Sequence, residues 1–162
     1  MSEQTLTDHA RGNAERHLLL AVDASENSKR AATYVADFFG KDQDVYVTIF
    51  SIIPEPSEDY FATDEERTRW VGKKQGEMND ILAGYKDILL SAGFKENQID
   101  VRLIVRQCES IGDAIIEEQA KLLSRIVIVG RRGISHNEEF VFGSTSSRIL
   151  HHAKNCAVMV IE

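Results

Sequence analysis

The stretch Ile126-Val127-Ile128-Val129-Gly130-Arg131-Arg132-Gly133 runs from a short aliphatic segment into two glycines, and Gly143-Ser144 follows after nine residues. The aliphatic segment predicts a buried β-strand. The hydroxyl-rich residues from Ser144 to Ser147 predict the start of a helix. Glycines let the main chain approach a ligand closely, and the free N–H groups at a helix start attract anions. The sequence therefore predicts a phosphate site between a strand and a helix.

The same alternation of strand and helix patterns occupies most of the chain. Strands are expected where short aliphatic or β-branched runs occur, at 17–23, 45–53, 99–105, 126–129 and 156–161. Ser25 is expected to cap the first helix, and the second is expected between Thr63 and Gly93. This order is typical of an α/β fold: a single-domain, open, parallel five-stranded sheet with helices on both faces. Ligands of such sheets bind beyond the carboxyl ends of the strands.

The apolar stripes of the four expected helices are predicted to face the sheet. They consist of Ala31, Ala32, Val35, Phe38 and Phe39 in the first helix, Trp70, Val71, Met78, Ile81, Leu82, Tyr85, Ile88 and Leu89 in the second, Ile111, Ala114, Ile115, Leu122 and Leu123 in the third, and Ile149, Leu150 and Ala153 in the fourth.

Composition narrows the class of protein. The 162 residues suit one domain at 17–162, preceded by a polar segment, 1–16, that is expected to be a flexible arm. A net charge of −7 argues against broad binding to nucleic acid or to an anionic membrane, because both require a basic surface. Residues 1–16 lack the apolar core of a signal peptide, and no apolar run is long enough to span a bilayer. A cytoplasmic protein with reduced Cys108 and Cys156 is expected.

Other phosphate-binding motifs fit less well. The chain contains no G-x-x-x-x-G-K-[ST] sequence, and the first expected strand leads into Asp23-Ala24-Ser25-Glu26 rather than into G-x-G-x-x-G. A plain turn would also use glycines. The loop is nevertheless longer than the 2–6 residues of most strand-to-helix connections, and it ends on hydroxyl residues that suit phosphate.

The spacing Gly130-x2-Gly133-x9-Gly143-Ser144 resembles the G-x2-G-x9-G-[ST] signature of the universal stress protein family. The likeness extends from about residue 17 to residue 162 and includes Val22-Asp23-x-Ser25 and Ile52-Ile53-Pro54. It implies a Rossmann-like fold of the adenine nucleotide alpha hydrolase type. It also implies an ATP-binding member of the family, and dimers.

The resemblance further implies a ligand, ATP or AMP, either alone or with Mg²⁺ or Mn²⁺. Gly130, Gly133, Gly143 and Ser144 would contact the ribose and phosphates, with Thr145 and Ser146 beside them. Asp23, with Ala21 and Val22, would lie at the adenosine half, and the main chain near Ile52 would meet the adenine edge. Arg131 and Arg132 are candidates to balance the phosphate charge. The segment Gln107–Ile111 departs from the family because it lacks a Gly-x-Pro.

No residue of the pattern suggests a general base, so slow ATP hydrolysis at most is expected. The leading hypothesis is a dimeric nucleotide-binding stress-response or signalling module. The alternative is a dimeric interaction protein with a vestigial pocket. In both, the apolar run Cys156–Ile161 is the expected dimer edge, since a sheet edge of this composition needs cover.

Overall fold

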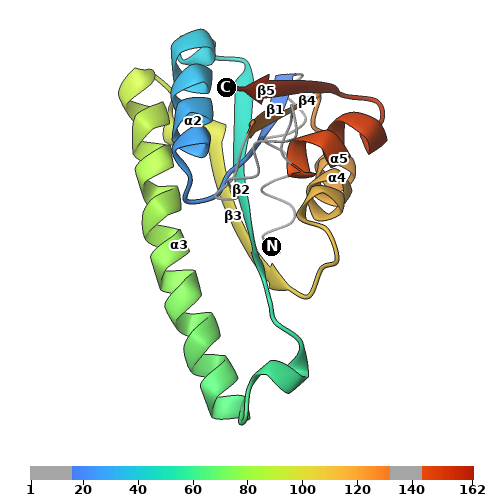
Figure 1. Ribbon diagram of the computed structural model, residues 1–162. Coiled ribbons are helices and arrows are strands. Elements are labelled where there is room, and N and C mark those ends of the chain that lie inside the picture. Colours follow the sequence, from blue (N-terminus) through green and yellow to red (C-terminus); the bar gives the residue numbers. More distant parts are fainter. Residues whose placement is uncertain (1–15, 132–143) are drawn as a thin grey trace, which may run out of the picture.

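The computed structural model describes residues 16–131 and 144–162, which form the expected α/β fold (Figure 1). Five parallel strands lie in the order β3-β2-β1-β4-β5. In chain order the elements are β1 (Arg16–Ala21), α2 (Glu26–Phe39), β2 (Val45–Pro54), η1 (Glu58–Tyr60), α3 (Asp64–Ala92), η2 (Glu96–Gln98), β3 (Ile99–Arg106), α4 (Ile111–Leu122), β4 (Ile126–Gly130), α5 (Ser144–His152) and β5 (Ala157–Ile161).

The sheet is covered on both faces, as the alternation predicts (Figure 1). Side chains alternate along a strand, so neighbours on β1 enter different cores. Leu18 and Leu20 pack with α2 and α3, whereas Leu19 and Ala21 pack with α4 and α5. Strands buried on both faces need continuous apolar runs, which explains why Leu18–Leu20 carries no polar residue.

The helix boundaries follow the capping residues. The Ser25 hydroxyl accepts a hydrogen bond from Ser28 N, and the Thr63 hydroxyl accepts one from Glu66 N, so both helices start where the sequence predicts. Gly93 ends α3 with a φ of 119°, a conformation that favours glycine. The strand ends are less well predicted: β1 stops at Ala21, not at Asp23, and β5 begins at Ala157.

Several residues predicted to be buried are not. The buried residues of α3 are Leu82, Tyr85 and Leu89, all in its second half, because its first turns extend past the sheet with the end of β2 and η1 (Figure 1). Trp70 and Val71 are therefore only half-buried. Phe38 is exposed and stacks on Tyr34, with ring centroids 4.3 Å apart. Leu123 and Leu150 are also exposed.

Within the described residues, none of the helices is both long and apolar enough to cross a membrane.

Candidate functional site

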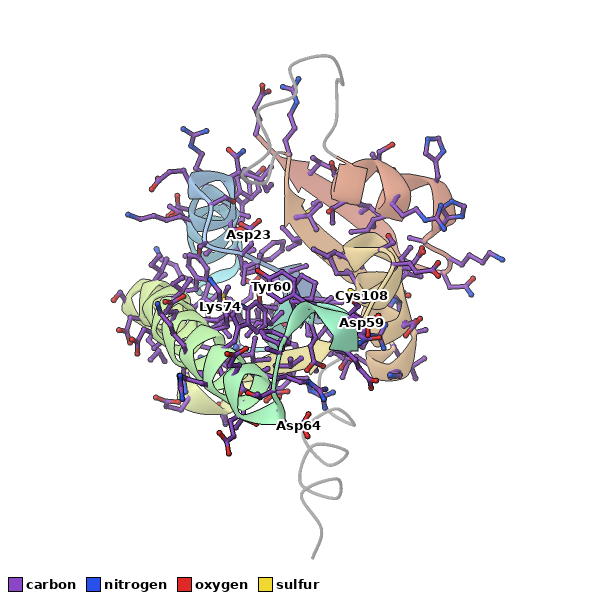
Figure 2. All side chains as sticks on the ribbon, turned by 60° about the horizontal axis from the view of Figure 1, so that its bottom comes forward. Asp23, Asp59, Tyr60, Asp64, Lys74 and Cys108 are labelled. Atoms are coloured by element: carbon purple, nitrogen blue, oxygen red, sulfur yellow. The ribbon has the colours of Figure 1, made fainter. Side chains whose placement is uncertain are left out.

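A cleft opens at the carboxyl ends of β1 and β4. The strand order places β1 at the centre, with β2 on one side and β4 on the other, so the loops after β1 and β4 depart to opposite faces. Figure 2 brings this end of the molecule forward, and Asp23 lies between the helices of the two faces. The described residues around the cleft enclose about 100 Å³.

The turn after β1 is organised by Asp23. Its Oδ1 accepts hydrogen bonds from Ser25 N at 2.8 Å and from the Ser28 hydroxyl at 2.9 Å. The Asp23 N–H in turn donates to Ser28 Oγ at 2.9 Å. One carboxylate oxygen therefore shapes the turn, while no described residue hydrogen-bonds to the other, Oδ2. Asp23 is only partly exposed, and it lines the cleft.

Two hydroxyl groups hold the main chain of this turn from neighbouring elements. Ser51 on β2 donates to the Val22 carbonyl at 2.7 Å, and Tyr85 on α3 donates to the Asp23 carbonyl at 2.6 Å. Burial, together with the nearby carboxylates of Asp23 and Glu26, raises the pKa of Tyr85 to about 12. The phenol is thus protonated at neutral pH and remains a donor.

Ile52 presents a main-chain donor and acceptor toward the cleft. Glu55 N donates to Arg106 O beside β3, whereas Phe50 O accepts from Val22 N beside β1. The main-chain N–H and C=O groups of odd-numbered β2 residues therefore point toward β3, and those of even-numbered residues point toward β1, since these groups alternate in direction along a strand. Strand β1 ends at Ala21, which pairs with Phe50. The next residue of β2 whose main-chain groups point to this side is Ile52, which lies beyond the end of β1. No described residue bonds its N–H or C=O on that side.

The walls of the cleft are apolar. Ile111 and Ile115 from α4 face Phe50 and Val129 from the sheet. Ile111 is 39% exposed although it lines the cleft, so part of its surface is open to a ligand. None of these four residues is predicted from the sequence to lie at the site; the periodicity of Ile111 and Ile115 predicts core residues instead. The signal for Ile111 is its place in the first turn of a helix after a strand end.

Gly130 has a structural reason to lack a side chain. A Cβ at this position would lie 2.8 Å from the main-chain carbon of Asn27, in the first turn of α2. A Cβ essentially never makes a non-bonded contact this short, so the lack of a side chain at Gly130 lets α2 start directly against the end of β4. Gly130 also lines the cleft, opposite Ser25 and Ser28, which the sequence did not place there.

The start of α5 divides the predicted hydroxyl residues. Thr145 lines the cleft. Ser146 is buried, and its hydroxyl donates to the Arg131 carbonyl at 3.3 Å, which ties α5 to the end of β4. The Arg131 guanidinium pairs with the Glu162 carboxylate beyond β5, and Arg131 is not among the residues that line the cleft.

A family model decides the identity of the chain. The model of the universal stress protein family matches residues 15–162, which is most of the sequence. The chain belongs to the universal stress protein family. A putative universal stress protein of Staphylococcus saprophyticus is 25% identical over 146 residues, which cover 90% of this chain and 83% of the relative.

Solved structures of universal stress proteins share the fold. UspA from Lactobacillus plantarum superposes with a TM-score of 0.76 at 17% identity, over 91% of this chain and 97% of that chain. A universal stress protein from Archaeoglobus fulgidus in complex with dAMP superposes with a TM-score of 0.64 at 19% identity, over 92% of this chain and 99% of that chain.

Of the residues predicted from the family signature, the fold brings Ala21, Val22, Asp23, Ile52, Gly130 and Thr145 together around the cleft. Arg131 and Ser146 are adjacent to the cleft but are engaged elsewhere. Arg132, Gly133 and Gly143 lie outside the described residues, as does the side chain of Ser144, the first residue of α5.

The described cleft offers little for acid–base or metal chemistry. Asp23 is the one carboxylate among its described lining residues, and these include no histidine or cysteine. In the described ranges no cluster of three or more histidine, cysteine, aspartate or glutamate residues is suited to a metal ion. What the arrangement offers is binding: apolar walls, one carboxylate oxygen, and main-chain hydrogen-bonding groups.

Proposed function

We propose that the cleft binds an adenine nucleotide, ATP or AMP, and that the protein acts as a dimeric stress-response or signalling module. The observation that carries this proposal is the Ile52 main-chain N–H and C=O pair, which faces an apolar cleft and has no described partner. Buried main-chain groups are nearly always paired, so these two groups suit a ligand that supplies the complementary pair.

Adenine has the matching edge. Its N6 amino group is a donor for the Ile52 carbonyl, and the adjacent N1 is an acceptor for the Ile52 N–H. The flat purine ring would lie between Ile111 and Ile115 of α4 and the sheet residues Phe50 and Val129. Burial of the ring supplies affinity, and the two hydrogen bonds supply selectivity for adenine.

The rest of the nucleotide follows the remaining polar groups. Asp23 Oδ2 is the acceptor for a ribose hydroxyl, and the main-chain N–H groups at the start of α5 suit phosphate. Mg²⁺ or Mn²⁺, where present, would be held mainly by phosphate oxygens, because Asp23 is the one carboxylate among the described cleft residues. Slow hydrolysis at most is expected from these residues.

Calorimetric titration with AMP and with IMP tests the adenine edge. IMP carries an acceptor at C6 and a donor at N1. Its acceptor would therefore meet the Ile52 carbonyl, and its donor would meet the Ile52 N–H, so neither hydrogen bond forms. AMP is expected to bind at least about tenfold more tightly than IMP, which corresponds to about 1.4 kcal/mol.

Asp23→Asn keeps the acceptor at Oδ1 that shapes the turn, and it is expected to weaken AMP binding about tenfold by removing the charge. Asp37→Asn, which removes the same charge from an exposed site near the other end of α2, is expected to have no effect.

A second function is favoured by the size of the cleft. Ligand pockets usually enclose several hundred Å³, whereas the described residues enclose about 100 Å³. A protein with a vestigial pocket would act through protein contacts alone. No heat of binding with ATP or AMP up to millimolar concentration, and no nucleotide in mass spectra of the purified protein, would favour this second function.

We also propose that β5 forms the dimer contact. This strand is an edge of the sheet, and its residues Val158 to Ile161 are half-buried and apolar. Ala157 N donates to Arg125 O, and Ile161 O accepts from Arg131 N. The main-chain groups of odd-numbered β5 residues therefore point toward β4. The main-chain groups of Val158 and Val160 therefore face the open edge, where a second β5 can pair with them.

Val160→Pro tests this edge, because it removes an N–H that faces outward and leaves the bonds to β4 in place. The wild type is expected to sediment as a dimer and the Val160→Pro variant as a monomer. Val160→Thr, which keeps the N–H and the β-branched shape, is expected to remain dimeric. A Val160→Pro variant that stays dimeric would place the contact elsewhere.

A further inference from the structure

Leu123, at the carboxyl end of α4, combines two unfavourable features. Its φ of 53° and ψ of 36° place it in the left-handed region, which glycine or asparagine normally occupies at the end of a helix. Its side chain is also 78% exposed. This backbone conformation ends the helix, and Ser124 N then donates to Gln119 O, five residues back, at 3.2 Å. A glycine would adopt the same conformation without strain. The leucine side chain itself contributes little to the folded chain.

Leu123 borders a surface hollow of about 690 Å³, which we call the α4–α5 hollow. It lies between the carboxyl ends of α4 and α5, which pack side by side on one face of the sheet (Figure 1). Ile116, Ala120 and Leu123 provide apolar surface, and Arg125, His152 and Lys154 provide basic side chains. The hollow is separate from the nucleotide cleft, because no described residue lines both.

Arg125 and Lys154 bring positive charge to the α4–α5 hollow, and none of its described lining residues is acidic. The acidic residues of α4 lie outside this lining, and each pairs with an arginine: Asp113 with Arg148 of α5, Glu117 with Arg106, and Glu118 with Arg102. Arg125 and Lys154 are exposed and take part in no ion pair among the described residues, whereas Arg148 and, to a smaller extent, His152 lower the pKa of the Asp113 carboxyl. A basic rim in a chain of net charge −7 attracts acidic partners locally.

We propose that the α4–α5 hollow docks an acidic segment of a partner protein that inserts one apolar side chain beside Leu123. The apolar surface supplies the anchor, and Arg125 and Lys154 pair with the flanking carboxylates. Exposed apolar surface rimmed by polar groups is typical of such contacts. This site uses no residue of the proposed nucleotide cleft, so it stands or falls independently of nucleotide binding.

The probe is a fluorescein-labelled synthetic peptide of aspartate and glutamate around one central leucine, measured by fluorescence anisotropy. The wild-type protein is expected to bind it, more weakly as salt screens the charges. Replacement of the central leucine by serine is expected to weaken binding about tenfold. In ¹H–¹⁵N NMR spectra, the amide resonances that shift on peptide binding are expected to belong to residues around Leu123, Arg125 and Lys154.

Two variants separate docking from folding. Leu123→Asn suits the left-handed conformation, so it is expected to raise or preserve the melting temperature while weakening peptide binding about tenfold. Lys154→Glu is expected to weaken binding at least tenfold, whereas Lys73→Glu, the same charge change at an exposed position on α3, is expected to change it less than twofold.

The proposal is overturned by any of four results: no anisotropy change at millimolar peptide, equal binding by wild type and Leu123→Asn, equal losses from Lys154→Glu and Lys73→Glu, or spectral changes confined to other surfaces. Binding to phosphatidylserine vesicles through the same residues, without peptide binding, would also overturn it and would assign the hollow to a membrane surface.

Discussion

Among individual residues, the shape of the cleft depends most on side chains that hold main-chain atoms in place. The Tyr85 hydroxyl reaches from α3 to the Asp23 carbonyl, and the Ser51 hydroxyl reaches from β2 to the Val22 carbonyl. Both contacts are long-range, so the shape of the turn after β1 is fixed by its neighbours as well as by Asp23 itself. A change at Tyr85 therefore affects both stability and the site.

Tyr85→Phe is expected to lower the free energy of unfolding by about 1 kcal/mol at pH 7 through the lost hydrogen bond. The substitution also changes how the free energy of unfolding depends on pH under alkaline conditions. The unfolded chain releases the phenolic proton near pH 10, whereas the folded chain keeps it to about pH 12. The contribution of this group to stability is therefore complete below pH 10 and is lost as the pH rises from 10 to 12. The free energy of unfolding, measured with urea across this pH range, is expected to fall less steeply for Tyr85→Phe than for the wild type. The exposed Tyr60→Phe is the control, and an equal effect there would contradict the prediction.

At the scale of elements, α4 and α5 are joined closely beside the cleft. Arg148 Nε and an Nη donate to the two oxygens of Asp113 at 2.8 and 3.0 Å, and this ion pair lowers the pKa of that carboxyl. A Cβ on Gly112 would lie 2.8 Å from Arg148 Cβ and 3.3 Å from the Thr145 carbonyl oxygen. Because Ile111 and Thr145 line the cleft from the two helices, their separation decides its width.

Gly112→Ala is expected to force α4 and α5 apart, to cost about 1–3 kcal/mol of stability, and to weaken AMP binding. Gly84→Ala on α3 is the matched control, because a Cβ there meets nothing within 4 Å. In that open helical position alanine is expected to add about 0.5–1 kcal/mol. Thermal unfolding and calorimetry measure both variants. A Gly112→Ala protein as stable as the Gly84→Ala protein would show that the two helices adjust without cost.

At the scale of the whole molecule, stability is distributed unevenly. β1 lies at the centre of the sheet, and Leu18, Leu19 and Leu20 are completely or almost completely buried. The first half of α3, by contrast, contributes no buried residue and extends beyond the sheet (Figure 1). Local opening there breaks few tertiary contacts.

Hydrogen exchange is therefore expected to be slowest at the amides of β1 and of the facing part of β2, Val45–Phe50, where opening requires global unfolding. Residues 64–77 of α3 are expected to exchange orders of magnitude faster than residues 82–89. Mass spectrometry of exchanged peptides measures both. Equal protection along α3 would mean that its first half packs against something not described above.

Much of the fold could be predicted because local sequence states it directly. Continuous apolar runs predict strands buried on two faces, and Ser25 and Thr63 mark helix starts by their own hydrogen bonds. The glycine and hydroxyl spacing after Val129 predicted the family, which the family model confirms. The errors lie where tertiary structure decides exposure: Trp70, Phe38 and Leu123 fit helical periodicity, but no element of the described ranges covers them fully.

Sequence alone was enough to predict the order of strands and helices along the chain, the family, and a site at Asp23 just after the first strand, since each depends on residues close together in the chain. Tertiary structure alone leaves the Ile52 main-chain groups open to the cleft, because this depends on where the neighbouring strand β1 ends. It also decided that Arg131 pairs with Glu162, and that Arg125, His152 and Lys154 gather around Leu123. Those contacts join residues from different elements, and only packing brings them together.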